Sequence, residues 1–239
     1  MECGTLKCSY AMLAARDAVT RPASGRLRSM NPQRLTLITI VIAVLVVAGV
    51  LIAPRLGGAA ASGEIDYAAQ PVAGSPDAPV KVAVFFDFLC PHCASFSETV
   101  TPIIKREFVD TGTASLYFLN FPVVDAARSR ALAVLGECVY QQDNDAFIEL
   151  EPIMLRAQNE LGNIGRATDI ALTYAPTLDE AALRTCVNAS QTADAVDADV
   201  AATRTFGLTG TPSVIVNGTV VSNPTLANVR RAIENAAEN

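Results

Sequence analysis

The sequence contains a single histidine, His92, and this scarcity argues against two kinds of chemistry. A structural zinc site takes four Cys or His ligands, but the chain has one Cys-x-x-Cys pair, Cys90 and Cys93, and no second one. A protease-like Cys-His pair would have to use His92 itself, which sits on the same tight turn as Cys90 and points poorly for general-base work. Two simpler interpretations of Cys90 and Cys93 are that they form half of a zinc site or a purely structural local disulfide.

The chain also lacks a basic surplus after its first part. Up to Arg34 it has six Lys or Arg against two acids, a net charge of +4, and from Arg55 onward it has twelve against twenty-two, a net charge of −10. A nucleic-acid-binding domain is expected to present a basic face. We therefore expect no nucleic-acid partner.

Charge is absent altogether from residues 35–53, an apolar run long enough to cross a bilayer as a helix. Arginines precede this run and acids dominate after it, so the positive-inside rule predicts a single-pass cell-membrane protein with residues 1–34 in the cytoplasm and the bulk of the chain on the extracytoplasmic (periplasmic) side. The run is a retained anchor or a long signal sequence, which a peptidase could cleave near Ala59-Ala60-Ala61. Because residues 1–29 show no periodicity, we take Met30 as a candidate for the true start.

The tetrapeptide Cys90-Pro91-His92-Cys93 follows an apolar run and precedes a helix-like stretch. With Cys90 as the helix N-cap, Pro91 falls at the first helical position, where its missing N–H costs nothing. The N–H groups of His92 and Cys93 then point toward the Cys90 sulfur, and the helix terminus favours negative charge there. The motif predicts an exposed nucleophile, Cys90, and a buried partner, Cys93.

A lowered pKa at Cys90 would make this pair an oxidant. Cysteines at such helix termini have pKa values of about 3.5 to 7.5, and each unit is worth about 1.4 kcal/mol in favour of the thiolate. Because a stable thiolate favours the reduced form, the disulfide tends to pass to another protein. His92 could assist as a donor or a cation near the sulfur.

The remaining pattern predicts a flexible linker over residues 54–78, rich in Gly, Ala, Ser and Pro, and a folded domain over 79–239. We expect strands at 80–86, 114–121, 212–216 and 219–221, helices at 90–109 (kinked at Pro102) and 225–236, and a helical insertion of about 125–206 with helices at 126–142, 146–158, 164–174, 179–188 and 193–206. The Asn217-Gly218 turn makes the last strand pair antiparallel, so the sheet is mixed.

This order of elements, the Cys90-Pro91-His92-Cys93 sequence and Gly210-Thr211-Pro212 before an apolar strand resemble the DsbA-like thiol:disulfide oxidoreductases of the thioredoxin superfamily, membrane-tethered members included. The resemblance covers residues 71–239. It implies an α/β thioredoxin-like fold with an inserted helical subdomain, here preceded by one transmembrane helix. It also implies a cis Thr211-Pro212 bond facing the dithiol, with the Thr211 backbone binding an extended substrate chain like an added strand.

One departure from the family concerns proton transfer. Relatives often carry a buried carboxylate six residues before the first cysteine, where this chain has Val84. Proton transfer from Cys93 must then use another group or water. Asp87 is a candidate to tune or relay, and capping of the loop into the helix is an equally good role for it.

Cys138 and Cys186 lie on two helices of the expected insertion and can form a second disulfide in an oxidising compartment. Closing a loop of this length is worth about 4 kcal/mol in the chain-entropy model. We interpret this disulfide as structural, and a redox relay between the two cysteine pairs is the less favoured alternative.

Our first hypothesis is therefore an oxidase without a cofactor or a metal, which donates the Cys90–Cys93 disulfide to reduced, unfolded exported polypeptides. The resemblance implies a membrane partner, DsbB-like or vitamin K epoxide reductase-like, that reoxidises it. A disulfide reductase or isomerase on the same fold is the alternative. A copper carrier that uses both thiolates and His92 is a third hypothesis, from a different class.

Overall fold

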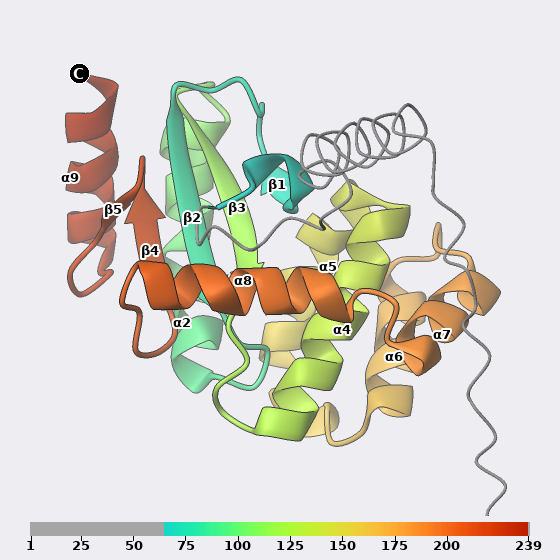
Figure 1. Ribbon diagram of the computed structural model, residues 1–239. Coiled ribbons are helices and arrows are strands. Elements are labelled where there is room, and N and C mark those ends of the chain that lie inside the picture. Colours follow the sequence, from blue (N-terminus) through green and yellow to red (C-terminus); the bar gives the residue numbers. More distant parts are fainter. Residues whose placement is uncertain (1–64, 239) are drawn as a thin grey trace, which may run out of the picture. The chain divides into compact units, whose positions relative to one another are not determined.

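The computed structural model describes residues 65–238, and its centre is a five-stranded sheet in the order β1-β3-β2-β4-β5 (Figure 1). The central strand β2 is parallel to β3 and antiparallel to β4, while β1 and β5 add antiparallel edges. The strands are β1 (Val72–Ala73), β2 (Val80–Phe86), β3 (Ala114–Asn120), β4 (Ser213–Val216) and β5 (Thr219–Val220). The expected α/β class and mixed sheet are confirmed.

Alternate residues of β2 face two separate cores, because successive side chains of a strand point to opposite faces. Val82 and Val84 lie in the larger core, which also holds side chains of the active-site helix, whereas Ala83 and Phe85 lie in the smaller one. Helix α8 (Ala193–Thr205) crosses the face of the smaller core (Figure 1). The strand is therefore buried on both faces, as its continuous apolar run predicts.

The segment between β3 and β4 is helical, as expected, and no strand occurs in it. Polar side chains cap four of its helices: Asp125, Asp143, Asn163 and Asp179 each accept a hydrogen bond from a backbone N–H of the first turn. The helices before α8 are α4 (Ala126–Gln142), α5 (Asn144–Arg156), the 3₁₀ turn η3 (Gln158–Glu160), α6 (Ile164–Tyr174) and α7 (Glu180–Ala189).

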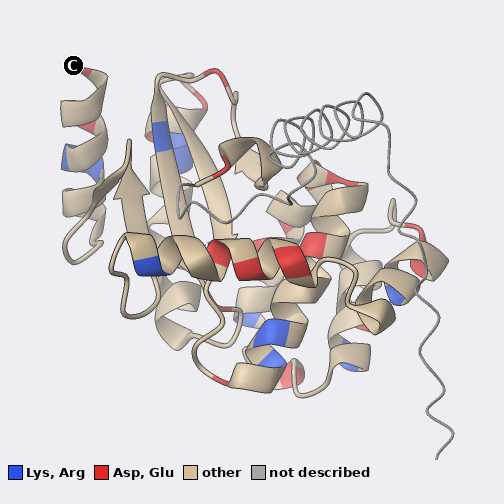
Figure 2. Ribbon diagram, in the orientation of Figure 1, with Lys and Arg blue, Asp and Glu red and all other residues tan. Residues whose placement is uncertain are grey.

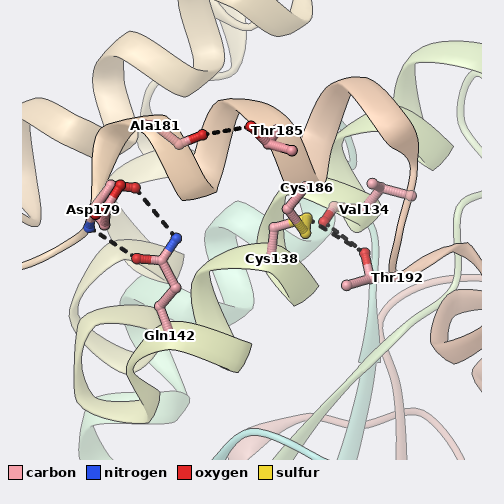
Figure 3. Close-up of a disulfide and its surroundings, with 8 residues drawn as sticks. All are labelled: Val134, Cys138, Gln142, Asp179, Ala181, Thr185, Cys186 and Thr192. Carbon is pink, nitrogen blue, oxygen red and sulfur yellow. Dashed lines mark hydrogen bonds between the residues drawn. A yellow bond between two sulfur atoms is a disulfide. The ribbon is translucent and has the colours of Figure 1, made fainter.

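A disulfide between Cys138 and Cys186 joins α4 to α7 inside this insertion (Figure 3). Their Cα atoms are 5.9 Å apart and 48 positions separate them in the sequence. Beside it, Thr192 donates a hydrogen bond to the carbonyl oxygen of Val134 at 3.0 Å. The Cys138–Cys186 disulfide therefore closes a long loop of the chain across the insertion.

The expected single helix from Cys90 to Val109 is instead divided into three segments. Helix α2 (Pro91–Thr99) ends at Val100, α3 (Thr101–Ile104) follows, and η2 (Lys105–Val109) is a π-helical turn. Pro102 lies in the first turn of α3, where a missing backbone N–H costs no helical hydrogen bond. The proline therefore falls at the beginning of a new helix and does not kink a continuous one.

The C-terminal part follows the sequence pattern closely. Asn217 and Gly218 both have positive φ, as a two-residue turn between β4 and β5 requires. The Asn217 side chain also accepts a hydrogen bond from the Lys81 N–H at 2.7 Å, which ties the turn to β2. Helix α9 (Leu226–Ala237) begins after Thr225, which caps it.

The predicted linker over residues 54–78 is wrong for its second half. Ile65 is buried, η1 (Tyr67–Ala69) is a 3₁₀ turn, and β1 pairs with β3. Gly74 is needed where it stands, because its φ is +94° and an added Cβ would lie 2.5 Å from Val109. The Gly, Ser and Pro content thus belongs to a tight ordered turn, and the folded domain includes residue 65.

The expected cytoplasmic segment 1–34, the apolar segment 35–53 and residues 54–64 lie outside the described residues. Within residues 65–238, none of the helices combines the length and the apolar character needed to cross a membrane.

Candidate active site around Cys90 and Cys93

The dithiol lies where the central strand passes into helix α2. Cys90 is the N-cap of α2, with extended backbone angles, and Pro91 is the first helical residue. The carbonyl oxygen of Cys90 accepts hydrogen bonds from the N–H groups of Cys93 and Ala94, both at 3.1 Å. This is the local geometry that the tetrapeptide predicts, and it fixes both sulfurs at the end of the sheet.

Both cysteines are free thiols, and both are buried. Cys90 is 5% exposed and Cys93 is 2% exposed, so the expectation of an exposed Cys90 is wrong. One contact that covers it comes from the loop before β4, where the carbonyl oxygen of Thr211 lies 3.4 Å from the Cys90 sulfur and accepts a hydrogen bond from it when Cys90 is protonated. The Thr211 loop therefore lies directly beside the sulfur that a substrate thiolate must reach.

Cys90 is held ready to ionise. Its pKa falls from 9.0 to about 5, above all because the Cys93 thiol donates a hydrogen bond to the thiolate. Burial opposes this shift, while the Thr211 side chain and the backbone N–H groups of Cys93 and His92 add smaller lowering effects. The helix terminus thus contributes, but it is not the main cause that the sequence alone suggested.

Cys93 shows the opposite shift. Its hydrogen bond to Cys90 and its burial raise its pKa far above the ordinary value, and the backbone N–H of Asp87 offsets only part of that effect. The two sulfurs therefore titrate as one coupled pair, in which a single proton is shared between them over a wide pH range. Cys90 carries the negative charge and Cys93 keeps the proton.

The Thr211-Pro212 peptide bond is cis, and its loop lies against Cys90. Thr211 and Pro212 are half-buried and directly precede β4, which pairs with β2, the strand that leads to the dithiol. The structure therefore brings the Cys90/Cys93 dithiol together with this loop, although the two lie far apart in the sequence.

Asp87 is buried, and its carboxylate holds two loops together. It accepts hydrogen bonds from the backbone N–H groups of Leu89 at 2.9 Å and of Val123 and Val124 at 2.8 Å each. The carboxylate therefore caps the turn into α2 and fastens the segment after β3 beside it. This geometry favours the capping role over proton relay, because the contacts keep the carboxylate occupied as an acceptor.

His92 and Pro91 are exposed on the first turn of α2. The structure does not gather His92 and the two thiols into a metal-binding group, and no cluster of three or more His, Cys, Asp or Glu fit for a metal occurs between residues 65 and 238.

Two polar residues of the insertion support the site and could not be recognised from the sequence. The Gln158 side-chain amide donates hydrogen bonds to the carbonyl oxygens of Phe88 at 2.9 Å and Cys90 at 2.8 Å. Glu151 is buried and accepts a hydrogen bond from Ser97 of α2 at 2.9 Å, and burial raises its pKa to about 7. Neither residue has a spacing that links it to the dithiol, so the sequence carries no signal for them.

A second buried polar cluster lies where α4, α8 and β3 meet. Asn120 donates hydrogen bonds to Glu137 at 2.7 Å and to Asp199 at 3.0 Å, and Gln70 donates to Asp199 at 2.9 Å. Burial raises the pKa of Glu137 to about 8 and that of Asp199 to about 6, and the Asp199 charge adds to the Glu137 shift.

Comparison with known proteins places this geometry in a family. A family model described as thioredoxin matches residues 67–235. The probable disulfide bond formation protein D of Bacillus anthracis is 30% identical over 214 residues, which cover 87% of this chain and 98% of that protein. The chain belongs to the thioredoxin family, among the DsbA-like thiol:disulfide oxidoreductases.

Solved structures of DsbA-like proteins agree with this assignment. BdbD from Bacillus subtilis in its oxidised form matches with a TM-score of 0.67 at 26% identity, covering 74% of this chain and 98% of that chain. DsbA from Chlamydia trachomatis matches with a TM-score of 0.65 at 25% identity, covering 74% and 95%. This DsbA-like chain is accordingly a protein disulfide oxidoreductase, and the coupled thiols of Cys90 and Cys93 provide the chemistry that such an enzyme needs.

Proposed function

We propose that this DsbA-like enzyme is an extracytoplasmic thiol oxidase that donates the Cys90–Cys93 disulfide to reduced, unfolded exported polypeptides. The observation that carries the proposal is the pKa of Cys90, which the Cys93 thiol lowers to about 5. A cysteine so strongly ionised stabilises the dithiol form, and this makes the disulfide the reactive, oxidising form. The same thiolate is a good leaving group at neutral pH.

The exchange proceeds in two steps that conserve electrons and protons. A substrate thiolate attacks the Cys90 sulfur, a mixed disulfide forms on Cys90, and Cys93 leaves and takes up a proton in its buried site. A second substrate thiolate then attacks the substrate sulfur of the mixed disulfide, and Cys90 leaves as a thiolate. The substrate loses two electrons and two protons, of which Cys93 keeps one proton and water receives the other.

The loop of Thr211 and Pro212 supports binding of an extended polypeptide. The Thr211 carbonyl lies 3.4 Å from the Cys90 sulfur, so a substrate that pairs with this backbone would place its own cysteine beside Cys90. Main-chain pairing of this kind selects for extended chains and not for particular side chains. Unfolded polypeptides are the substrates that offer such backbone.

The enzyme must be reoxidised after each turnover, and we infer a membrane partner of the DsbB-like or vitamin K epoxide reductase-like type. The apolar segment 35–53 would hold the enzyme in the cell membrane near that partner, with the domain on the periplasmic side. The excess of acidic residues from Arg55 onward fits this setting and argues against nucleic acid. Figure 2 shows acidic residues following one another along α8.

Redox titration of the protein against glutathione tests the direction of the reaction. We expect a reduction potential closer to that of a strong oxidant, about −120 mV, than to the −270 mV or so of thioredoxin. A value near the lower figure would overturn the oxidase assignment and favour the disulfide reductase.

The roles of the two cysteines are tested by Cys93→Ser. In this variant the Cys90 thiolate can attack a disulfide of an exported protein and expel one substrate thiolate, but no neighbouring thiol can then displace the substrate from Cys90. The variant should therefore accumulate stable mixed disulfides with exported proteins. Cys90→Ser is the matched control and should trap nothing. Trapping by Cys90→Ser but not by Cys93→Ser would reverse the assignment.

A further inference from the structure

Gln158 is the residue of the helical insertion that touches the backbone of the dithiol. It begins η3, directly after α5, and its side-chain nitrogen donates one hydrogen bond to Phe88 and one to Cys90. Both amide hydrogens are therefore used on carbonyl oxygens of the loop between β2 and α2. Phe88 is buried, and in the described part of the chain its carbonyl oxygen accepts no other hydrogen bond.

The Cys90 carbonyl has a crowded environment in which Gln158 makes the shortest contact. The N–H groups of Cys93 and Ala94 approach this oxygen at 3.1 Å each, whereas Gln158 approaches it at 2.8 Å. The orientation of the Cys90 peptide determines where its own sulfur lies relative to the Cys93 thiol and the N–H of His92. Those are groups that stabilise the thiolate.

We propose that Gln158 is a positioning residue for disulfide exchange, which stabilises the Cys90 thiolate by fixing the carbonyl groups of Phe88 and Cys90 in the loop that carries it. These carbonyl oxygens carry negative partial charge in the same loop as a sulfur that must also be negative. A donor on each of them offsets that charge and prevents either peptide from turning toward the sulfur. Electrostatic effects of this kind are strong at buried sites, where water does not screen them.

Another glutamine of the same insertion, Gln142, also holds a backbone segment in place through its side-chain amide. Gln142 at the end of α4 donates a hydrogen bond to the Asp179 carbonyl at 3.4 Å and accepts one from the Asp179 N–H at 2.9 Å, so it fastens the start of α7 (Figure 3). Gln142 therefore serves as a matched control, because its loss removes two backbone contacts that do not involve the active-site loop.

The test compares Gln158→Met, Gln158→Glu and Gln142→Met in the full-length protein. Methionine keeps the length of the side chain without its donors, and glutamate places an oxygen against two carbonyl oxygens. The thiolate absorbance of the reduced protein is titrated with pH, and the equilibrium with glutathione is measured. We expect Gln158→Met to raise the Cys90 pKa by about half a unit to one unit, a three- to tenfold loss of thiolate relative to thiol.

Gln158→Glu should shift both measurements further in the same direction, and Gln142→Met should leave them unchanged. The inference rests on the proposed exchange at Cys90, but the two can fail separately. If the unmodified protein titrates near 5 and neither Gln158 variant moves that value, the exchange stands and Gln158 has no positioning role. If Gln142→Met shifts the titration equally, or if neither Gln158 variant folds while Gln142→Met does, the role of Gln158 is structural and the inference is overturned. An unmodified thiol that titrates near 9 would instead remove the proposed function.

Discussion

The two cysteine pairs of this chain have the same side chains and opposite properties. Cys90 and Cys93 lie together at the start of helix α2; both are free thiols, and their ionisation is coupled. Cys138 and Cys186 lie on two different helices and form a disulfide. A disulfide across four residues closes too small a ring to stabilise the fold much, while one across 48 positions restrains a large part of the unfolded chain. Sequence separation and local donors together decide which pair reacts and which one stabilises.

The sharpest test of this comparison removes the reactive sulfur of the first pair and, in a separate variant, both sulfurs of the second pair. Cys90→Ser should abolish oxidation of a reduced, unfolded protein, because the sulfur that accepts the substrate thiolate is gone. The variant should unfold at nearly the same denaturant concentration as the oxidised enzyme, which has no thiolate, and should be less stable than the reduced enzyme at neutral pH, because the lowered Cys90 pKa favours the folded thiolate. Oxidase activity above that of buffer in Cys90→Ser would show that the other pair, or another group, exchanges disulfides.

The double variant Cys138→Ser/Cys186→Ser should have the converse effect. We expect a loss of about 2 to 4 kcal/mol in the free energy of unfolding, because a loop of this length is no longer closed in the unfolded chain. Denaturant unfolding measures the loss, and the thiolate titration of Cys90 serves as the control, which should not change. A changed titration with unchanged stability would indicate a redox relay between the pairs.

Buried carboxylates away from the dithiol should affect stability but not exchange. Burial and the charge of Asp199 raise the pKa of Glu137 to about 8, so the folded protein holds a proton there that the unfolded chain releases near pH 4.3. The contribution of Glu137 to stability is therefore most favourable at low pH and is lost as pH rises from about 4.3 through 8. Glu137→Gln should remove this loss and should make the protein more stable at pH 8 than the unmodified enzyme by about 1 to 2 kcal/mol.

Denaturant unfolding at pH 5 and pH 8 measures this effect, with Glu149→Gln as the control, because Glu149 is an exposed glutamate of the same insertion. The control should show no difference between the two pH values beyond that of the unmodified protein. A Glu137→Gln variant that is less stable at pH 8 would mean that the ionised carboxylate stabilises the cluster.

The contrast between the pairs also explains what the sequence could reveal. Cys90, Pro91 and Cys93 define a helix start by local rules, and Asn217-Gly218 defines a turn in the same way, so their positions could be predicted. The mixed sheet and the helical insertion followed from the order of such local signals. The cis Thr211-Pro212 bond came from a family resemblance and not from the residues themselves.

The features that escaped prediction depend on contacts between distant parts of the chain. β1 has only two residues, too few for an alternation pattern, so its segment was taken for a linker. Cys90 is buried because the Thr211 loop lies against it, and Gln158 reaches the dithiol from 68 residues downstream. No spacing rule connects such positions, because the tertiary fold alone brings them together.

The smallest effect is expected from a substitution of His92. This substitution tests whether the Cys93 thiol, and not the imidazole of His92, is the main cause of the lowered Cys90 pKa. The imidazole is exposed, and it is the backbone N–H of His92, not the side chain, that helps to lower the Cys90 pKa. His92→Ala keeps that N–H, so the Cys90 pKa should rise by about one unit or less, at most a tenfold change in the ratio of thiolate to thiol. Thiolate absorbance against pH measures it, with the exposed Ser95 changed to Ala as a control on the same helix. A rise of two units or more would show that the imidazole, and not Cys93, is the principal partner of the reactive sulfur.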